Sequence, residues 1–224
     1  MPRACVFDVN ETLLDLAALD SRFESVFGDR SIRREWFLQM LQNAFVATIT
    51  HTYSDFGALG NAALTMVSER REVELADEDR QHILSGMREL PPHPDVEEGL
   101  RRLRNAGFRL AALTNSTRQV EEAQLEYAGL TDYFEQALSA DTVGRLKPAP
   151  EPYRMAAESL GVDVGEVRLI AAHAWDVAGA LRAGCAAAFV ARPGMVFDPL
   201  VEQPDVMGAN LLEVADGIIG AEAG

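Results

Sequence analysis

Cysteine is scarce in this sequence, and the two cysteines lie far apart. Cys5 and Cys185 both sit in or beside apolar runs, and no CxxC pair occurs among the 224 residues. Cysteines in such surroundings behave as small hydrophobic side chains. The pattern excludes a disulfide framework and a cysteine metal centre.

Positive charge is also in short supply. Lys and Arg number 20 against 35 Asp and Glu, which gives a formal net charge of -15. Such a chain lacks the basic surface by which proteins bind phosphate backbones, so no nucleic-acid partner is expected. An acidic protein also repels small anions at long range, so an anion site has to be built from local donors.

Long hydrophobic runs are absent as well. No stretch reaches the roughly 18 apolar residues of a membrane-spanning helix, and the N-terminus enters a strand-like segment without a charged leader. We therefore expect a cytoplasmic protein with no membrane partner. Hydrophobic residues still make up 48% of the sequence, which is enough for a sizeable core.

The first apolar run, residues 5–7, ends in Asp8, and Thr12 follows four residues later. A buried parallel strand delivers a reactive group to its carboxyl edge in this way, so Asp8 is a candidate nucleophile. Taken alone, Asp8 fits equally well as the cap of a following helix.

The segment from residue 16 to residue 90 has a different character. Apolar residues recur there at helical spacing in the windows 36–49, 56–68 and 77–88, and no strand pattern occurs. The prolines at 91, 92 and 94 cannot continue a helix and mark the end of this segment. We predict a helical cap domain, 16–90, inserted into a core domain formed by 1–15 and 91–224.

From residue 95 onward, helix and strand patterns alternate. The sequence predicts helices at 96–105, 119–127, 151–160 and 176–183, and strands at 108–113, 134–139, 167–172 and 187–191. The strand at 187–191 is expected to be the last. Repeated βα units of this length imply an α/β fold with a doubly wound parallel sheet and helices on both faces.

Active sites in such sheets lie outside the carboxyl ends of the strands. Four separate pieces of chain supply polar groups at these ends, namely Asp8, Thr114 with Asn115, Lys147, and the run from His173 to Asp176. This convergence favours a catalytic role for Asp8 over a helix cap.

Together these residues resemble the haloacid dehalogenase superfamily. Its four motifs stand here as Asp8 to Thr12, Thr114-Asn115, Lys147-Pro148, and Ala171 to Asp176. The resemblance covers nearly the whole chain, including a cap after the first motif. It implies a haloacid dehalogenase-like core related to the Rossmann fold.

Two branches of that superfamily differ at named positions. Mg-dependent phosphohydrolases carry an Asp two residues after the nucleophile and another at the start of the fourth motif, where this chain has Asn10 and Ala172. Mg²⁺ prefers carboxylate oxygens, and these two positions provide none. We therefore expect no metal and no other cofactor, and regard a phosphohydrolase as the alternative.

The type II 2-haloacid dehalogenases resemble this chain more closely, through Ala174-Trp175-Asp176, Lys147-Pro148 with Tyr153, and Trp36 in the cap. The resemblance implies that Asp8 displaces halide from a short 2-haloacid and that water then hydrolyses the aspartyl ester. It gives Lys147 the task of keeping Asp8 ionised and binding the substrate carboxylate or the ester oxygen. Asp176 would position or deprotonate the water, and Thr12 would orient the carboxylate. The substrate-binding residues would be Val9, Asn10, Phe37, Leu41, Phe56, Thr114, Asn115, Tyr153 and Trp175.

Two departures from that branch affect halide capture. Phe37 follows the cap Trp where the familiar enzymes carry Arg, and Ala172-His173 replaces Ser-Asn. We hypothesise that His173 donates to the departing halide or assists the water near Asp8. The charge of Glu11 is unwelcome in an anion site unless its side chain points away.

These departures keep a third reading open, that of a catalytically silent relative that binds a small acid or a protein partner. They also suit a substrate smaller than the usual 2-haloacids, with fluoroacetate as one candidate. The apolar residues of the cap are compatible with a homodimer.

Overall fold

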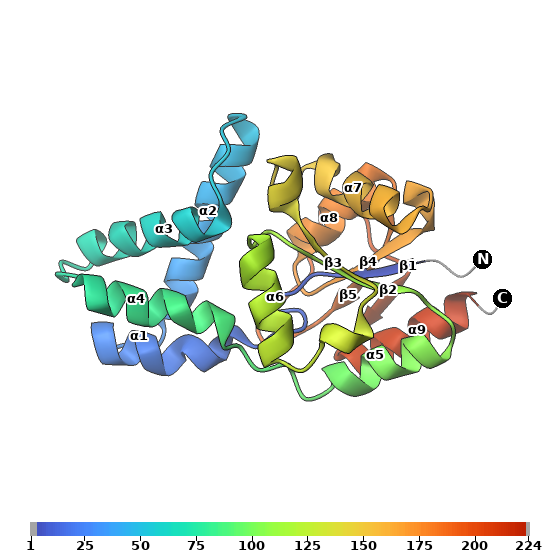
Figure 1. The fold of residues 1–224 in the computed structure, drawn as a ribbon, viewed down its shortest axis with the longest axis horizontal. Coiled ribbons are helices and arrows are strands. Elements are labelled where there is room, and N and C mark those ends of the chain that lie inside the picture. Colours follow the sequence, from blue (N-terminus) through green and yellow to red (C-terminus); the bar gives the residue numbers. More distant parts are fainter. Residues whose placement is uncertain (1–3, 223–224) are drawn as a thin grey trace.

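The structure, a computed structural model that describes residues 4–222, is built around a parallel sheet (Figure 1). Its strands are β1 (Ala4–Phe7), β2 (Leu110–Thr114), β3 (Gln136–Ser139), β4 (Val167–Ala171), β5 (Ala186–Val190) and β6 (Val206–Gly208). They lie in the order β3-β2-β1-β4-β5-β6, and each neighbouring pair is parallel. The predicted α/β fold with a doubly wound parallel sheet is confirmed.

β1 lies inside the sheet, between β2 and β4, and every residue from Ala4 to Phe7 is buried. Parallel strands that are covered on both faces read as continuous apolar runs, which is the pattern that the sequence has here. The chain leaves β1 at Asp8, whose backbone N–H still donates to Ile170 O of β4 at 3.0 Å. Asp8 is therefore fixed at the carboxyl edge of the sheet.

Helices cover both faces of the sheet (Figure 1). α5 (Val96–Asn105) packs beside α9 (Leu211–Glu222) on one face, and α7 (Pro150–Leu160) packs beside α8 (Ala174–Ala183) on the other. α6 (Arg118–Tyr127) lies against β3. Successive strand residues alternate between two apolar cores, because side chains along a strand point to opposite faces.

Four further helices lie together at one side of the sheet (Figure 1). They are α1 (Asp20–Phe27), α2 (Ile32–Ile49), α3 (Phe56–Arg70) and α4 (Asp77–Ser85). α2 and α3 pack closely, and the Trp36 indole donates to Gly60 O at 2.8 Å. Gly60 permits this approach, since a Cβ there would lie 2.9 Å from Met40 Sδ. No strand occurs between residues 16 and 90, all of which the structure describes.

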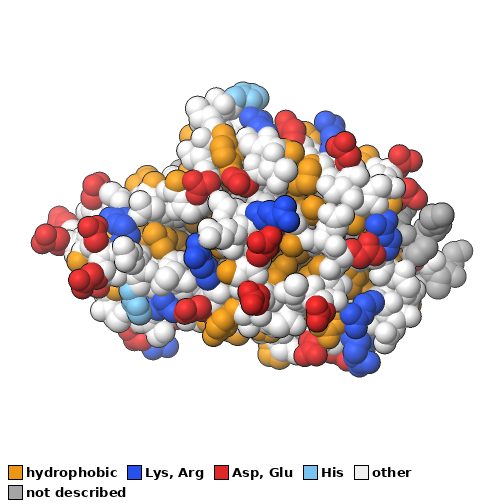
Figure 2. Space-filling model, in the orientation of Figure 1, with side chains coloured by type: hydrophobic (Ala, Val, Ile, Leu, Met, Phe, Trp, Pro, Cys, Tyr) orange, Lys and Arg blue, Asp and Glu red, His pale blue; other side chains and the backbone are white. Residues whose placement is uncertain are grey.

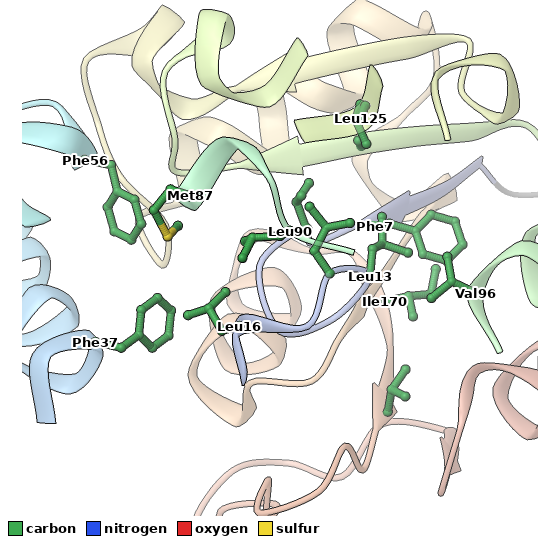
Figure 3. Close-up of a cluster of buried hydrophobic side chains, with 14 of the residues drawn as sticks. Phe7, Leu13, Leu16, Phe37, Phe56, Met87, Leu90, Val96, Leu125 and Ile170 are labelled. Carbon is green, nitrogen blue, oxygen red and sulfur yellow. The ribbon is translucent and has the colours of Figure 1, made fainter. Parts of the chain in front are cut away.

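The two connections to this helical segment run side by side. The backbone N–H of Asp15 donates to Pro91 O at 2.8 Å, and that of His93 donates to Leu13 O at 2.9 Å. Apolar contacts continue across the connection, from Phe7 in the sheet through Leu13 to Phe37 and Phe56 on α2 and α3 (Figure 3). The helices therefore share one core with the sheet.

Short 3-10 turns link several of these elements. They lie at Leu16–Leu19, Gly86–Arg88, Thr131–Tyr133, Ala140–Val143 and Val164–Glu166.

The expectation that the strand at 187–191 is the last one is wrong. That strand is β5, and the chain continues through an irregular segment into β6 and α9. β6 has only three residues and lies at the edge of the sheet, so it carries no alternating pattern. α9 contains Gly217 and Gly220, and glycine weakens the helical signal of a sequence.

Both cysteines are free and buried. None of the helices within residues 4–222 is long and apolar enough to cross a membrane. Figure 2 shows acidic side chains spread over the visible face and mixed with Lys and Arg.

Candidate active site

Four chain segments bring the predicted polar residues to the carboxyl edge of the sheet. Asp8 follows β1, and Thr114 ends β2 directly before Asn115. Lys147 precedes α7, while His173 joins β4 to α8 and Asp176 lies in the first turn of α8. Each of these side chains is less than a tenth exposed. The convergence predicted from the strand ends is present in the fold.

Asp8 is held on both of its carboxylate oxygens. Lys147 Nζ donates to Oδ1 at 2.8 Å, and the Thr12 hydroxyl donates to Oδ2 at 2.6 Å. The Thr12 oxygen in turn accepts the backbone N–H of Ala172 at 2.9 Å, which fixes its position. Burial favours the neutral acid, but the positive charge of Lys147 and the nearby His173 ring hold the pKa of Asp8 well below its usual value. Asp8 is therefore an oriented, desolvated carboxylate.

Lys147 uses all three of its ammonium hydrogens within the protein. It donates to Asp8, to Asp176 Oδ2 at 2.6 Å and to Leu113 O at 3.0 Å. Burial lowers the pKa of Lys147, but the carboxylates of Asp176 and Asp8 outweigh burial and raise it above its usual value. The side chain of Asn115 accepts from Lys147 N at 2.8 Å and donates to Lys147 O at 3.3 Å. Asn115 thus positions the lysine backbone.

Asp176 is completely buried between Lys147 and Tyr153. The Tyr153 hydroxyl donates to Asp176 Oδ1 at 2.6 Å. Gly179 leaves room for this contact, because a Cβ at that position would lie 2.5 Å from the tyrosine oxygen. Burial raises the pKa of Asp176, and the opposing charge of Lys147 does not fully offset it. A carboxylate with a raised pKa is a stronger base.

The His173 ring lies between two carboxylates. Its Nε2 atom lies 2.9 Å from Glu11 Oε2, and its Nδ1 atom lies 3.4 Å from Asp8 Oδ2. The second contact is too long for a well-formed hydrogen bond, and buried Nδ1 has no hydrogen-bond partner within residues 4–222. Burial lowers the pKa of His173, but the two carboxylates outweigh burial and raise it to about 9. The ring packs against Trp175 and Phe37, with centroid distances of 5.3 and 6.1 Å.

A cavity of about 10 Å³ lies in front of Asp8. Its apolar side is formed mainly by side chains of α2 and α3. Ten residues line it, and all of them are predicted site residues: Asp8, Asn10, Phe37, Leu41, Phe56, Thr114, Asn115, Lys147, His173 and Trp175.

Four other predicted residues lie outside the cavity lining. Thr12, Tyr153 and Asp176 are buried behind it and act on the lining residues through the hydrogen bonds above. The Val9 side chain packs in the apolar core, and Val9 O accepts the N–H groups of residues 13 and 14. A direct substrate contact for Val9 is therefore left to its backbone.

Arg192 lies outside the cavity lining but holds the backbone of Thr12, and it was not predicted from the sequence. Its guanidinium donates twice to Thr12 O, at 3.0 and 2.9 Å, and pairs with Asp95 at 2.6 Å. Arg192 follows β5 by two residues. The rule that strand ends supply the site was the signal that could have found it.

The donor set does not fit Mg²⁺. The amide of Asn10, at the position of the second phosphohydrolase acid, donates to Ser116 Oγ at 3.3 Å and accepts from Gln124 at 3.0 Å. The ammonium of Lys147 bridges the carboxylates of Asp8 and Asp176. No cluster of three His, Cys, Asp or Glu side chains suited to a metal ion occurs in the described part of the chain.

Fold and site together define a hydrolase of the haloacid dehalogenase class. The chain belongs to the haloacid dehalogenase-like hydrolase family, whose sequence model matches residues 2–184.

Among curated proteins, (S)-2-haloacid dehalogenase 4A of Burkholderia cepacia is 33% identical over 184 residues, which cover 81% of this chain and 80% of that protein. The solved L-2-haloacid dehalogenase of Xanthobacter autotrophicus superposes with a TM-score of 0.91 at 26% identity, over 98% of this chain and 99% of that one. The same enzyme has been solved with chloropropionic acid covalently bound, and it matches this chain equally well.

Proposed function

We propose that this protein hydrolyses the carbon–halogen bond of short 2-haloacids through an ester formed on Asp8, without a metal ion. The observation that carries the proposal is the ionised, buried Asp8, oriented by Lys147 and Thr12 at a cavity with apolar walls. The similarity to 2-haloacid dehalogenases, one of them with a covalently bound haloacid, supports the same chemistry.

In the first step, a carboxylate oxygen of Asp8 attacks the carbon that bears the halogen. The new carbon–oxygen bond forms as halide leaves with the bonding electrons, which gives an ester on Asp8. A carboxylate is a weak nucleophile in water, so removing its solvent and fixing it in line with the bond are what the site contributes. His173 Nδ1–H donates to the departing halide.

In the second step, water attacks the carbonyl carbon of the Asp8 ester. One proton of the water passes to Asp176 by way of the Lys147 ammonium, which lines the cavity and donates to Asp176. The second hydrogen of the water passes to the product oxygen as the ester bond breaks, so that a 2-hydroxy acid leaves and Asp8 is restored as a carboxylate. Asp176 then releases its proton. The overall change converts a 2-haloacid and water into a 2-hydroxy acid, halide and a proton. The raised pKa of Asp176 suits it to this task as a general base.

Lys147 acts on the reaction through Asp8. Because its three hydrogens are already donated, direct binding of a substrate carboxylate would break an existing bond. We assign Lys147 to keeping Asp8 ionised and then to polarising the ester. The substrate carboxylate is left to Thr114 and the amides of Asn10 and Asn115, which line the cavity.

The size of the cavity favours a short substrate. A volume of about 10 Å³ holds the centre of about one water molecule, so Phe37, Leu41 and Phe56 have to move apart to admit even a haloacetate. We propose that residues 16–90 act as a cap domain that makes this movement over a core of residues 1–15 and 91–224. Haloacetates and small (S)-2-haloacids are the proposed substrates.

The alternative functions fit the site less well. A phosphohydrolase would need acids at Asn10 and Ala172, and the Asn10 amide is tied to Ser116 and Gln124. A silent relative that binds a small acid or a protein partner has no need of a base with a raised pKa next to a desolvated nucleophile.

We also propose that the protein forms a homodimer through its helical segment and acts in the cytoplasm. Leu38, Val46 and Ile49 of α2 and Met66 of α3 are exposed apolar side chains. Light scattering of the purified protein tests the dimer, and Ile49→Glu is expected to weaken it.

The function is tested by halide release from fluoro-, chloro- and bromoacetate and from 2-chloropropionate in EDTA, measured by ion chromatography. Halide release by the wild type and its loss in Asp8→Asn are expected. A single turnover in H₂¹⁸O with excess enzyme places ¹⁸O in Asp8 and leaves the product unlabelled if the ester forms. Label in the product of that first turnover contradicts the covalent mechanism.

A further inference from the structure

The Glu11 carboxylate points at His173 and lies at the rim of the site. Oε2 makes the 2.9 Å contact with His173 Nε2, while Oε1 lies 3.5 Å from Arg33 Nη1. The histidine contact is a hydrogen bond, and the arginine contact is longer and electrostatic. Arg33 is directed mainly to Asp20, at 2.5 Å. Glu11 is therefore bonded first of all to the histidine of the site.

The backbone of Glu11 is held in an unfavourable conformation to make this contact. Its φ is +62°, in the left-handed region, where a side chain costs about 1 kcal/mol that glycine does not incur. Glu11 N donates to Leu14 O at 2.8 Å, and Glu11 O lies 3.2 Å from the His93 ring. Strained residues of this kind cluster where the side chain has a task.

The charge state of His173 decides how many donors it offers. A neutral imidazole carries one N–H, whereas an imidazolium carries two. With Glu11 on Nε2, the ring is oriented so that Nδ1 lies near Asp8 at the cavity. Only the imidazolium can bond Glu11 through Nε2–H and at the same time present Nδ1–H to a departing anion.

We propose that Glu11 is a positioning residue that holds the His173 ring as an imidazolium with Nδ1–H presented to the reaction cavity. The proposal rests on the function proposed above and adds the residue that supplies the positive charge for halide departure. Glu11 itself does not line the cavity. Its charge therefore acts on substrate only through the histidine.

The charged groups around His173 set the expected pH dependence. Asp8 and Glu11 raise the pKa of the ring, and burial lowers it. Lys147 and Asp176 lie beyond Asp8, and Arg33 lies beyond Glu11. Because the pKa of His173 is raised to about 9, the ring is a cation below that pH and loses its charge above it. Activity is therefore expected to fall on the alkaline side of pH 9.

The test is a histidine NMR titration of wild type and Glu11→Gln, followed through the ring Cε1–H signals. The chain has four histidines, and the signal that disappears in His173→Gln is the signal of His173. In Glu11→Gln, the pKa of His173 is expected to fall by at least one unit. The alkaline limb of kcat for halide release should move by the same amount, so that kcat of Glu11→Gln at pH 8.5 falls about fourfold relative to pH 7, whereas that of the wild type changes little. Glu35→Gln, which removes a carboxylate paired with Arg70 and Arg71 on the cap, is the matched control and should change neither.

Glu11→Gly is the second variant, because glycine suits the positive φ and keeps the loop folded. It should remain folded and still lower the pKa of His173, because the relief of the positive φ partly offsets the lost hydrogen bond. An unchanged His173 pKa in either folded variant overturns the proposal, whatever the activity. Failure of the proposed function shows differently, as no halide from the wild type or as halide release that survives Asp8→Asn.

Discussion

The hydroxyl of Tyr153 donates to Asp176 on the carboxylate oxygen that Lys147 leaves free, at 2.6 Å. If Asp176 serves the water step, Tyr153→Phe should slow ester hydrolysis more than ester formation. Hydrogen bonds to charged groups contribute about 1.5–3 kcal/mol, so the second step should slow roughly 10- to 100-fold. Rapid-quench kinetics should show a halide burst followed by a slow steady state, with the ester detectable by mass spectrometry. Tyr127→Phe, an exposed tyrosine, is the control. A burst that vanishes would place Tyr153 in the first step.

Glu121 on α6 is buried outside the proposed machinery. Burial raises the pKa of its carboxyl to about 8, more than its neighbours lower it. The folded state therefore keeps a proton that the unfolded state loses above about pH 4.5, and stability falls as pH rises from there to about 8. Glu121→Gln removes this dependence and should gain about 1.4 kcal/mol per pH unit over the wild type in that window. Urea unfolding at pH 5.5 and 7.5 measures the difference. Glu122→Gln, which changes an exposed neighbour on the same helix, should show the same pH dependence of the free energy of unfolding as the wild type. The same pH dependence in Glu121→Gln and the wild type would contradict the raised pKa of Glu121.

Leu41 forms part of the apolar wall of the cavity. Leu41→Ala should enlarge the cavity and raise kcat/KM for 2-chlorobutyrate relative to chloroacetate. The same change should lower the free energy of unfolding by about 2–3 kcal/mol, since a buried leucine is truncated. Leu200→Ala, which truncates a leucine that is 94% exposed and lies outside the helical segment, is the control and should alter neither quantity. An unchanged substrate ratio in a destabilised Leu41→Ala would show that Leu41 does not limit substrate size.

Arg192 ties the loop after β1 to Asp95, which itself accepts the backbone N–H of Leu211 in α9. Arg192→Lys keeps the charge and loses the paired geometry. We expect about 2 kcal/mol less stability and a lower kcat, because the Thr12 carbonyl loses two bonds. Differential scanning calorimetry beside halide release measures both, with exposed Arg154→Lys as the control. Full stability in Arg192→Lys would mean that one ammonium replaces the whole guanidinium.

The strands and most of the helices could be predicted because buried elements have recognisable apolar patterns in the sequence. β1 is a continuous apolar run and β4 is apolar apart from Arg168, and a polar residue follows each strand at its carboxyl end, which was enough to place Asp8 and His173. β6 and α9 were missed because a three-residue edge strand and a glycine-containing helix have no such pattern.

The residues of the site could be predicted from the sequence, but the hydrogen bonds among them could not. The direction of the Glu11 side chain depends on a positive φ that no pattern of residues predicts. Asn115, predicted as a substrate-binding residue, is also bonded to the Lys147 backbone, and the lysine ammonium has no hydrogen left for a substrate. Such contacts depend on side-chain geometry between segments more than 30 residues apart in the chain.

The adjoining ends of the helical segment have a consequence for how the protein can change over generations. Leu13 and Asp15 are bonded to His93 and Pro91, so the chain enters and leaves the segment at nearly one point. Because the two ends meet, a change in the length of the segment does not by itself separate β1 from its neighbours. A replacement segment would, however, have to keep the apolar contacts that Phe37 and Phe56 make with the shared core. Change in the wall that these two residues form is therefore tied to the packing of the sheet.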